Sequence, residues 1–390
     1  MTFFKSKLRA FSFILAILIC GTSLSAISEA AVIFLLIEPG SRPGAMGQAY
    51  VAQAEGAIGN YWNTGALAFN RKSEVSWMHT NWLGDVDGIN DMYIEYIGWD
   101  KYYKGIGTLG ASVTYLTYGE QTKTNANGDE LGTFSSYELA LGLSYAKQIS
   151  ENTGLGIQFK YILSDLSPEG TGETEVDTKG RGMSWAFDFG LKQRNVNPSY
   201  ILYSPVNAFI GIYNFGAFLA GTDGQDYFSE DWEIKKLDFG LNLQNLGPDI
   251  SFINEEQEDP LPLNFRMGLS YRLLEEKYNR LTINADMNKL LANSAYGPIE
   301  RIWHCWYDDD SSVEMKEIIY NVGAEYIYLN LLALRAGYIS DRAGKIEGAS
   351  FGIGVQVPVT KTLRLDIDFA MQEAGELTDY NKTFSFGAKF

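Results

Sequence analysis

The sequence ends with Lys382-Thr383-Phe384-Ser385-Phe386-Gly387-Ala388-Lys389-Phe390. These nine residues bear most directly on the choice between a soluble sandwich and a closed barrel. Successive side chains of a strand point to opposite faces, so Phe384, Phe386, Ala388 and Phe390 form one apolar stripe beside a polar one. At the edge of a soluble sandwich, such a strand would promote aggregation through its unpaired backbone groups. In a closed barrel it pairs on both sides and turns its stripe to lipid. This stretch alone leaves both alternatives open.

A secretory signal peptide is predicted at residues 1–30, and it favours the barrel. Three basic residues lie between positions 5 and 9, and the apolar run over residues 11–20 is too short to span a bilayer comfortably. Ala26 or Ala30 offers a small residue for cleavage. We therefore expect export, with the bacterial outer membrane as the destination.

The composition restricts which partners the protein can bind and what can stabilise its fold. The net charge is −17, and cleavage after Ala30 would leave 28 basic against 47 acidic residues, a charge of −19. Nucleic acid would be repelled, so no nucleic-acid partner is expected. Only Cys305 would remain after cleavage, which excludes an intramolecular disulfide. Aromatic residues make up 14% of the chain and glycines number 40, as expected for the aromatic girdles and close strand packing of a barrel.

From Glu74 onward, apolar residues recur at every second position, which predicts strands. We count 14 segments of about ten residues, a length that matches a tilted transmembrane strand. The prediction is an all-β fold, a transmembrane antiparallel β-barrel of about 14 strands over residues 74–390. Apolar stripes such as Met92, Ile94 and Tyr96 are expected to face lipid. Intervening polar or tiny residues, such as Asn284, Asp286 and Asp368, are expected to line the lumen.

The connections alternate in length, which orients the predicted barrel. Short turns are expected at Ser150–Asn152, Glu275–Asn279, Tyr328–Leu331 and Pro358–Thr362. Long polar loops are expected at Gly119–Phe134, Asp165–Gly180, Gly247–Leu261 and Leu291–Glu314. Because bacterial barrels have short periplasmic turns and long outer loops, both termini are expected in the periplasm.

Residues 195–232 break this alternation, because they fall on the short-turn side. They are interpreted as an insertion into the barrel, with additional strands as the alternative. The part from Tyr200 to Gly221 is apolar enough to be considered as a transmembrane helix. Its prolines, asparagines and glycines weaken the helix, and its aromatic and β-branched residues favour strand.

Residues 31–73 do not alternate and are predicted to form a small N-terminal plug. Their many small side chains suit a compact segment that packs closely against other backbone. The glycines between Gly40 and Gly47 resemble a phosphate-binding loop, but no strand precedes them and no Lys-Ser/Thr pair follows. No cofactor is expected.

A catalytic or metal site is not expected either. His79 lies in a predicted strand and is either a lumen base or a structural residue. His304 and Cys305 precede the acidic run Asp308–Asp310, which is a metal site or, as we interpret it, a surface loop. No residue marks a nucleophile, so a hydrolase is only the third alternative, and we expect no enzyme.

Two stretches of sequence resemble the PorV/PorQ family. The first is Ala31-Val32-Ile33-Phe34-Leu35-Leu36-Ile37 with Pro39-Gly40-Ser41-Arg42, Gly44-Ala45-Met46-Gly47 and Tyr61-Trp62-Asn63. The second is Leu243-Gln244-Asn245-Leu246-Gly247-Pro248 with Asp259-Pro260-Leu261-Pro262-Leu263-Asn264-Phe265-Arg266-Met267-Gly268. The family is similar in turn to FadL-type barrels, which have 14 strands and an N-terminal plug.

The resemblance implies a role beside the type IX secretion translocon. PorV-like barrels bind the C-terminal domains of exported cargo and pass them to a surface attachment complex, so the expected partners are the translocon barrel, cargo C-terminal domains and outer-membrane lipid. The alternative is a FadL-like transporter of hydrophobic small molecules. The aromatic end, Phe390, is expected to be the signal read by the barrel assembly machinery. The expected binding positions are Met46, Gly47, Trp62, Asn63, Asn245, Gly247, Pro260, Pro262, Asn264 and Arg266.

The chain departs from the FadL-type pattern in the predicted plug. Asn63-Thr64-Gly65 stands where such plugs usually have Asn-Pro-Ala, and Glu55-Gly56 stands where an acidic pair is often found. Without the proline a rigid turn is lost, which argues against a FadL-like gating role for the segment.

Overall fold

The structure is a computed structural model that describes residues 30–82, 91–124, 127, 129–167, 180–196, 236–252, 258–375 and 380–390. The predicted signal peptide lies outside these residues, apart from residue 30. Most of the predicted insertion at 195–232, with the apolar part from 200 to 221, lies outside them too. Within the described ranges, no helix is both long and apolar enough to cross a membrane.

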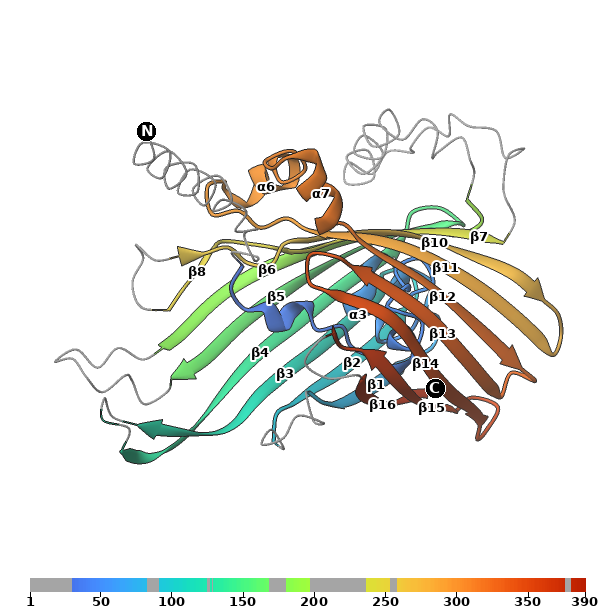
Figure 1. Ribbon diagram of the computed structural model, residues 1–390. Helices are drawn as coiled ribbons and strands as arrows, with labels where there is room; N and C mark the ends of the chain where they lie inside the picture. The colour runs from blue at the N-terminus through green and yellow to red at the C-terminus, as the bar shows by residue number, and fades with distance from the viewer. Residues whose placement is uncertain are drawn as a thin grey trace, which may run out of the picture.

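Fourteen strands in the described part of the chain close into an antiparallel barrel, which confirms the predicted fold class (Figure 1). Neighbours in sequence pair around the wall, β7 pairs with β10, and β1 pairs with β16 to close the ring; β8 and β9 form a separate two-stranded sheet. The strands are β1 (Glu74–Asn81), β2 (Tyr93–Tyr103), β3 (Gly107–Thr124), β4 (Glu130–Gln148), β5 (Thr153–Ser167), β6 (Gly180–Gln193), β7 (Leu237–Leu246), β8 (Ile250–Ser251), β9 (Glu258–Asp259), β10 (Asn264–Glu275), β11 (Asn279–Leu290), β12 (Ile319–Tyr328), β13 (Leu332–Asp341), β14 (Ile346–Pro358), β15 (Arg364–Glu373) and β16 (Tyr380–Lys389).

The C-terminal stretch is the closing strand. β16 pairs with β1 on one side and with β15 on the other. Phe384 and Phe386 point outward, with 53% and 38% of their surface exposed. Phe390 continues the ladder, because its N–H donates to the carbonyl of Ser73 at 2.9 Å and its carbonyl accepts from the N–H of Ser73 at 2.9 Å. The barrel alternative is therefore confirmed and the soluble sandwich is excluded.

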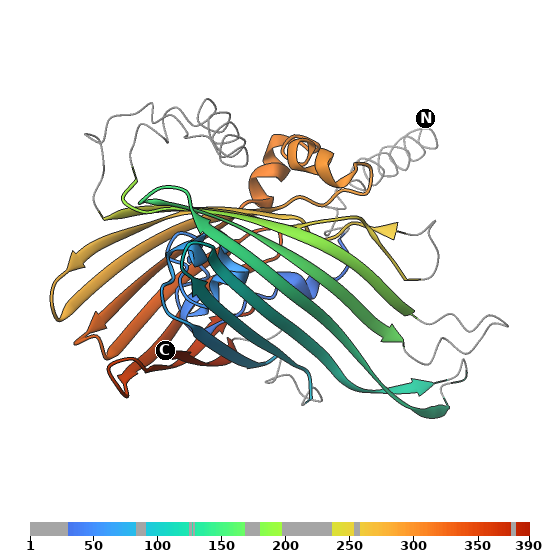
Figure 2. The same ribbon diagram turned by 180° about the vertical axis from the view of Figure 1, so that it is seen from behind.

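Two strands are much longer than a membrane requires. β3 has 18 residues and β4 has 19, whereas β12 and β13 have 10 each. The predicted loop Gly119–Phe134 is therefore wrong, since the pairing continues through Glu120 with Ser135 to Thr124 with Glu130. Outside the membrane a hairpin needs no lipid-facing stripe, so the apolar alternation ends before the strands do. Both views show β3 to β6 extending past the other strands at the end of the barrel where β3 connects to β4 and β5 to β6 (Figures 1 and 2).

Residues 31–73, here called the interior segment, occupy the inside of the barrel (Figure 2). The N–H of Ala31 donates to the carbonyl of Pro260, in the long connection between β7 and β10, whereas Ser73 pairs with Phe390 at the short-turn end. The two ends of the described chain thus lie at opposite ends of the barrel, and the expectation that they share one end is wrong. The short helices of the segment are η1 (Ile33–Leu36), α2 (Ser41–Gly44), α3 (Gly59–Trp62) and η2 (Thr64–Phe69).

The interior segment also reverses the predicted face of one strand. Ile94 and Tyr96 of β2 are buried inside the wall, in one apolar cluster with Phe34, Leu35 and Trp62. The prediction that they face lipid is wrong, because the apolar interior segment makes the adjoining part of the lumen a hydrophobic core. Here an apolar alternation marks the inner face of the wall.

The long connection between β11 and β12 contains two short helices. They are α6 (Pro298–His304) and α7 (Ser311–Glu317). Both views show them outside the wall, on the side of β10 and β11 (Figures 1 and 2).

Candidate functional site: the contact between interior segment and wall

A network of buried charges attaches the interior segment to the wall. Arg42 makes a two-pronged ion pair with Glu325 of β12, from Nε to Oε2 at 2.7 Å and from Nη2 to Oε1 at 2.7 Å. Its Nη1 reaches Glu55 at 2.6 Å. Glu325 also accepts from Nε of Arg335 at 2.7 Å, and Arg335 pairs with Asp368 at 2.5 Å. Two-pronged arginine–carboxylate pairs fix geometry as well as contributing energy, so the network sets how the segment sits in the barrel.

A wall carboxylate binds the backbone of the interior segment directly. Oδ2 of Asp286 on β11 accepts from the N–H of Tyr50 at 2.6 Å and from the N–H of Val51 at 2.8 Å. Tyr50 in turn packs edge-on against Trp62, with the ring centroids 5.7 Å apart. Because buried amides need partners, an inward carboxylate here holds a turn that has no regular structure of its own.

Trp62 lies at the centre of the contact with β10. Its Nε1 donates to the carbonyl of Pro39 at 2.8 Å, and the guanidinium of Arg266 stacks over its ring at 4.7 Å. Arg266 also pairs with Glu38 and donates from Nη1 to the carbonyl of Gln48 at 3.2 Å. Trp62 and Arg266, which were predicted as binding positions from two separate stretches of the sequence, are therefore in contact.

Glycines of the wall make a flat surface for η2. A Cβ added at Gly65 would lie 2.7 Å from the carbonyl oxygen of Gly190 and 2.9 Å from that of Gly154. A Cβ at Gly156 would lie 2.3 Å from Thr64. Asn63 fixes this approach, since its Oδ1 accepts from the N–H of Gly65 at 3.0 Å and its Nδ2 donates to the carbonyl of Leu191 at 2.9 Å. Only glycine fits at position 65, which explains one departure from the Asn-Pro-Ala pattern.

The predicted positions of the second stretch hold the connection between β7 and β10. Asn245 has a positive φ of 66°, and its Nδ2 donates to the carbonyl of Pro262 at 2.9 Å. Nδ2 of Asn264 donates to Gln244 at 3.2 Å. A Cβ at Gly247 would lie 2.0 Å from the carbonyl oxygen of Trp185, so the chain crosses β6 in close contact.

The predicted binding positions thus bind other parts of the same chain. Met46 is fully buried, and a Cβ on the neighbouring Gly47 would lie 2.5 Å from the backbone of Tyr338 on β13. Pro260 accepts the hydrogen bond from Ala31 already described. These positions bring the interior segment and the wall together, whereas Phe390 lies apart from them at the end of β16.

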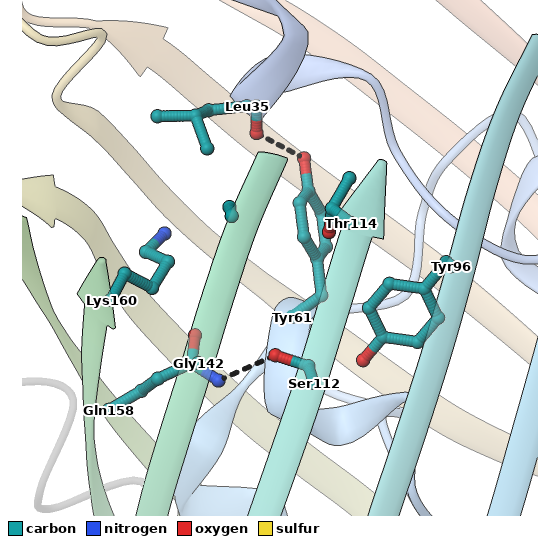
Figure 3. A pocket seen from close by; sticks show the side chains of 9 residues that line it. Leu35, Tyr61, Tyr96, Ser112, Thr114, Gly142, Gln158 and Lys160 are labelled. Atoms are coloured by element: carbon teal, nitrogen blue, oxygen red, sulfur yellow. Dashed lines mark hydrogen bonds between the residues drawn. The ribbon is translucent and has the colours of Figure 1, made fainter. Parts of the chain in front are cut away.

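A small cavity remains between the interior segment and the wall (Figure 3). Its volume is about 10 Å³, room for about one water molecule. Tyr61, Gln158 and Lys160 line it; Tyr61 donates to the carbonyl of Leu35 at 3.1 Å, and Gln158 donates to Ser112 at 3.2 Å. A hydrocarbon does not fit into a space of this size.

The two histidines lie outside the lumen. His79 faces outward, with its Nδ1 2.7 Å from Glu95, whose other oxygen accepts from Nε1 of Trp77 at 2.6 Å. The lumen-base interpretation of His79 is therefore wrong. His304 stacks on Tyr296 at 4.6 Å. In the described residues, no group of three or more His, Cys, Asp or Glu side chains could hold a metal ion.

Glu325 and Arg335 were not among the positions predicted from the sequence. They pair directly across β12 and β13, and both are buried. The sequence did contain a sign of them, because each is a charged residue at one of the inward positions between the apolar residues of its strand. Their partnership with Arg42, nearly three hundred residues away, has no local signature.

A family model described as "Type IX secretion system protein PorV" matches residues 23–191 and 214–296. No curated protein sequence matches the chain. Solved structures with a similar fold include the toluene transporter TodX of Pseudomonas putida (12% identity, 90% of this chain and 96% of that chain, TM-score 0.49). The toluene transporter TbuX of Ralstonia pickettii is also similar (12%, 90% and 97%, 0.47), as is a FadL homologue of Pseudomonas aeruginosa (9%, 90% and 98%, 0.43).

Proposed function

The chain belongs to the PorV family, and we propose that it acts in type IX secretion as an outer-membrane barrel that binds the translocon and cargo C-terminal domains. The family match over most of the chain carries this proposal. The interior segment would act as a plug that stiffens the barrel, and the proposal involves no enzymatic step.

The contact between interior segment and wall supports a binding role over a transport role. A transporter of hydrophobic molecules needs an apolar pocket of several hundred Å³. The cavity beside Tyr61 holds about one water, and the neighbouring segment is attached by the ion pairs of Arg42 with Glu55 and with the buried Glu325. Removing such a segment for each transport event would break several buried charge pairs, each of them costly to break.

The extended ends of β3 to β6 offer a surface for a protein partner. We call residues 118–124, 130–136, 164–167 and 180–186 the projecting sheet. Within the described residues β2 begins at Tyr93, which pairs with Thr117, so no described strand lies beside β3 beyond that point. A sheet edge of this kind can accept a strand from another protein through backbone hydrogen bonds.

A pull-down tests the proposal. The tagged protein is recovered in mild detergent, and the expected result is a large barrel partner together with cargo chains. In a second variant residues 121–134 are replaced by an Asn-Gly turn, which shortens the β3–β4 hairpin while keeping its register. We expect that variant to lose cargo but keep its own fold, and a variant with Thr360→Ala in a short turn to behave as the wild type.

The same experiment decides against the proposal if the tagged barrel is recovered only with lipid or small hydrophobic molecules. That outcome would favour the transporter. Unchanged recovery of cargo with the shortened hairpin would contradict the role of the projecting sheet while leaving the translocon contact intact.

A further inference from the structure

The helical connection between β11 and β12 presents an unusual apolar surface. Ile299, Trp303, Tyr307 and Met315 are 68%, 67%, 64% and 62% exposed, among the most exposed large apolar side chains of the described residues. Ile299 and Trp303 are four residues apart on α6 and therefore lie on one face. We call these four residues the apolar face of the helical pair.

The opposite side of the pair is packed against the outside of the barrel wall. Trp306 meets Phe265 of β10 edge-on, with ring centroids 5.4 Å apart. Cys305 is buried with Leu263 and Leu291, and Ile302 packs against the same cluster. The pair is thus attached beside the wall, and both views show it alongside β10 and β11 (Figures 1 and 2).

The charges at this contact are neutralised by one another. Lys289, an outward residue of β11, pairs with Glu314 and, at 3.0 Å, with Glu317, and its ammonium lies 5.6 Å from the Trp306 ring. Arg301 makes a two-pronged pair with Asp249, at 2.6 and 2.7 Å. Paired charges can lie at the edge of a membrane, where unpaired ones are costly.

We propose that the helical pair α6–α7 is a membrane anchor whose apolar face inserts into the outer leaflet beside the barrel. Continuity with the lipid-facing wall supports lipid as the occupant. The outward residues Leu269, Ile283, Tyr320 and Val322 are exposed on β10, β11 and β12, the strands that contact the pair or follow it directly. The apolar face therefore extends the band of the barrel that already faces lipid.

The residue types fit the interface between lipid and water. Trp and Tyr prefer this zone, because their rings are apolar and their polar groups stay hydrated. Asp308–Asp310, which join the helices, are exposed and would remain in water. A hollow of about 260 Å³ between Trp306, Met315 and Ile318 opens beside the face and gives room for an acyl chain. The anchor assigns the β10–β12 side of the barrel to lipid, which leaves the projecting sheet for partners.

Fluorescence quenching tests the anchor in the full-length protein. Trp303→Cys is labelled with bimane and reconstituted into phosphatidylcholine nanodiscs containing doxyl-labelled phosphatidylcholine. Cys20 lies in the predicted signal peptide and is expected to be removed with it. Cys305 stays in place, because its thiol is buried and burial raises its pKa to about 12, which keeps it inert. Asp310→Cys is the matched control in the same connection, and Phe386→Cys on the wall reports full lipid contact.

At position 303 we expect doxyl quenching at least half as strong as at position 386 and at least threefold stronger than at position 310. Aqueous iodide should quench in the reverse order. Strong iodide quenching at 303 without doxyl quenching would overturn the anchor and leave the face to a protein partner. Trp303→Ser with Ile299→Ser, which should keep the heat-modifiable barrel, serves as a second variant. In the full-length protein, this change should lower doxyl quenching of bimane at Met315→Cys at least twofold, and unchanged quenching there would also overturn the proposal.

Discussion

At the residue scale, a few charged side chains hold the interior of the barrel together. They are shielded from water and form ion pairs with one another. Glu325 accepts from Arg42, Arg335 and Gln53 at once, with donor distances between 2.7 and 2.8 Å. Such a buried group stabilises only while its partners are in place, because each unpaired charge left behind carries its full desolvation penalty. The network therefore makes the interior segment and the wall depend on each other.

Glu325→Ala should destabilise the barrel strongly. The change leaves Arg42 and Arg335 without their shared carboxylate, and removing one partner of a buried pair costs about 3–5 kcal/mol. The measurement is the free energy of unfolding in urea, followed by the heat-modifiable shift on gels. The control is Glu347→Ala, because Glu347 and Arg342 are 3.9 Å apart and exposed. Its expected effect is below about 0.5 kcal/mol. Equal effects of the two variants would refute the importance of the network.

The sequence reveals these residues only in part. Arg42 belongs to a family-like stretch and Asp286 stands out as polar on an inward position, so both could be named in advance. The partner of each could not, because a pairing across the lumen depends on the register of distant strands. His79 shows the converse, since a strand position alone does not say which face looks outward.

At the element scale, alternation identified most strands correctly, but it located their ends poorly. Apolar residues recur at every second position only where one face of a strand meets lipid. The pattern therefore ends before β3 and β4 do. It also cannot separate lipid from an apolar plug, which is why the face of β2 carrying Ile94 and Tyr96 was assigned to the wrong side. The interior segment gave no periodic signal at all, because its short helices are held by the wall.

Gly65→Ala should loosen the docking of η2 on the wall. The new Cβ would lie within 2.9 Å of backbone oxygens on two strands, and such overpacking typically costs about 1–3 kcal/mol. Limited proteolysis should then cleave the interior segment faster than in the wild type. Gly297→Ala is the matched control, since the nearest atom to its Cβ is 3.8 Å away. Identical cleavage of all three proteins would show that the close approach does not hold the segment.

Phe390→Asp should lower the amount of assembled barrel in the outer membrane. The aromatic ring is 53% exposed at the end of the closing strand, while the backbone pairing with Ser73 does not need it. Quantitative immunoblots of outer-membrane fractions measure the effect, and Phe390→Tyr should retain normal levels. Normal levels of the Asp variant would rule out an assembly signal at this position.

At the scale of the whole molecule, the interior segment lies along the inside of the barrel. The interior segment enters beside Pro260 and leaves at Ser73, so it runs from one end of the lumen to the other. The wild-type protein should therefore carry no large single-channel current in planar bilayers, whereas deletion of residues 31–69 should open one. Equal currents from both proteins would contradict a sealed lumen.

The architecture as a whole could be predicted from the sequence, because number, length and alternation of strands together admit few folds. The surfaces outside the membrane-spanning barrel could not be predicted. The sequence showed neither the projecting sheet nor the packing of α6–α7 against the wall, since both depend on where strands end relative to one another. The first of these surfaces is the one that we propose for a protein partner, and the second is the one that we propose for lipid.

We propose that this barrel serves the release of secreted proteins. Mass spectrometry of the culture medium, comparing the wild type with a gene deletion and with the deletion complemented by the intact gene, tests it most directly. Proteins with type IX C-terminal domains should disappear from the medium of the deletion strain and return on complementation. Their normal release by the deletion strain would contradict it.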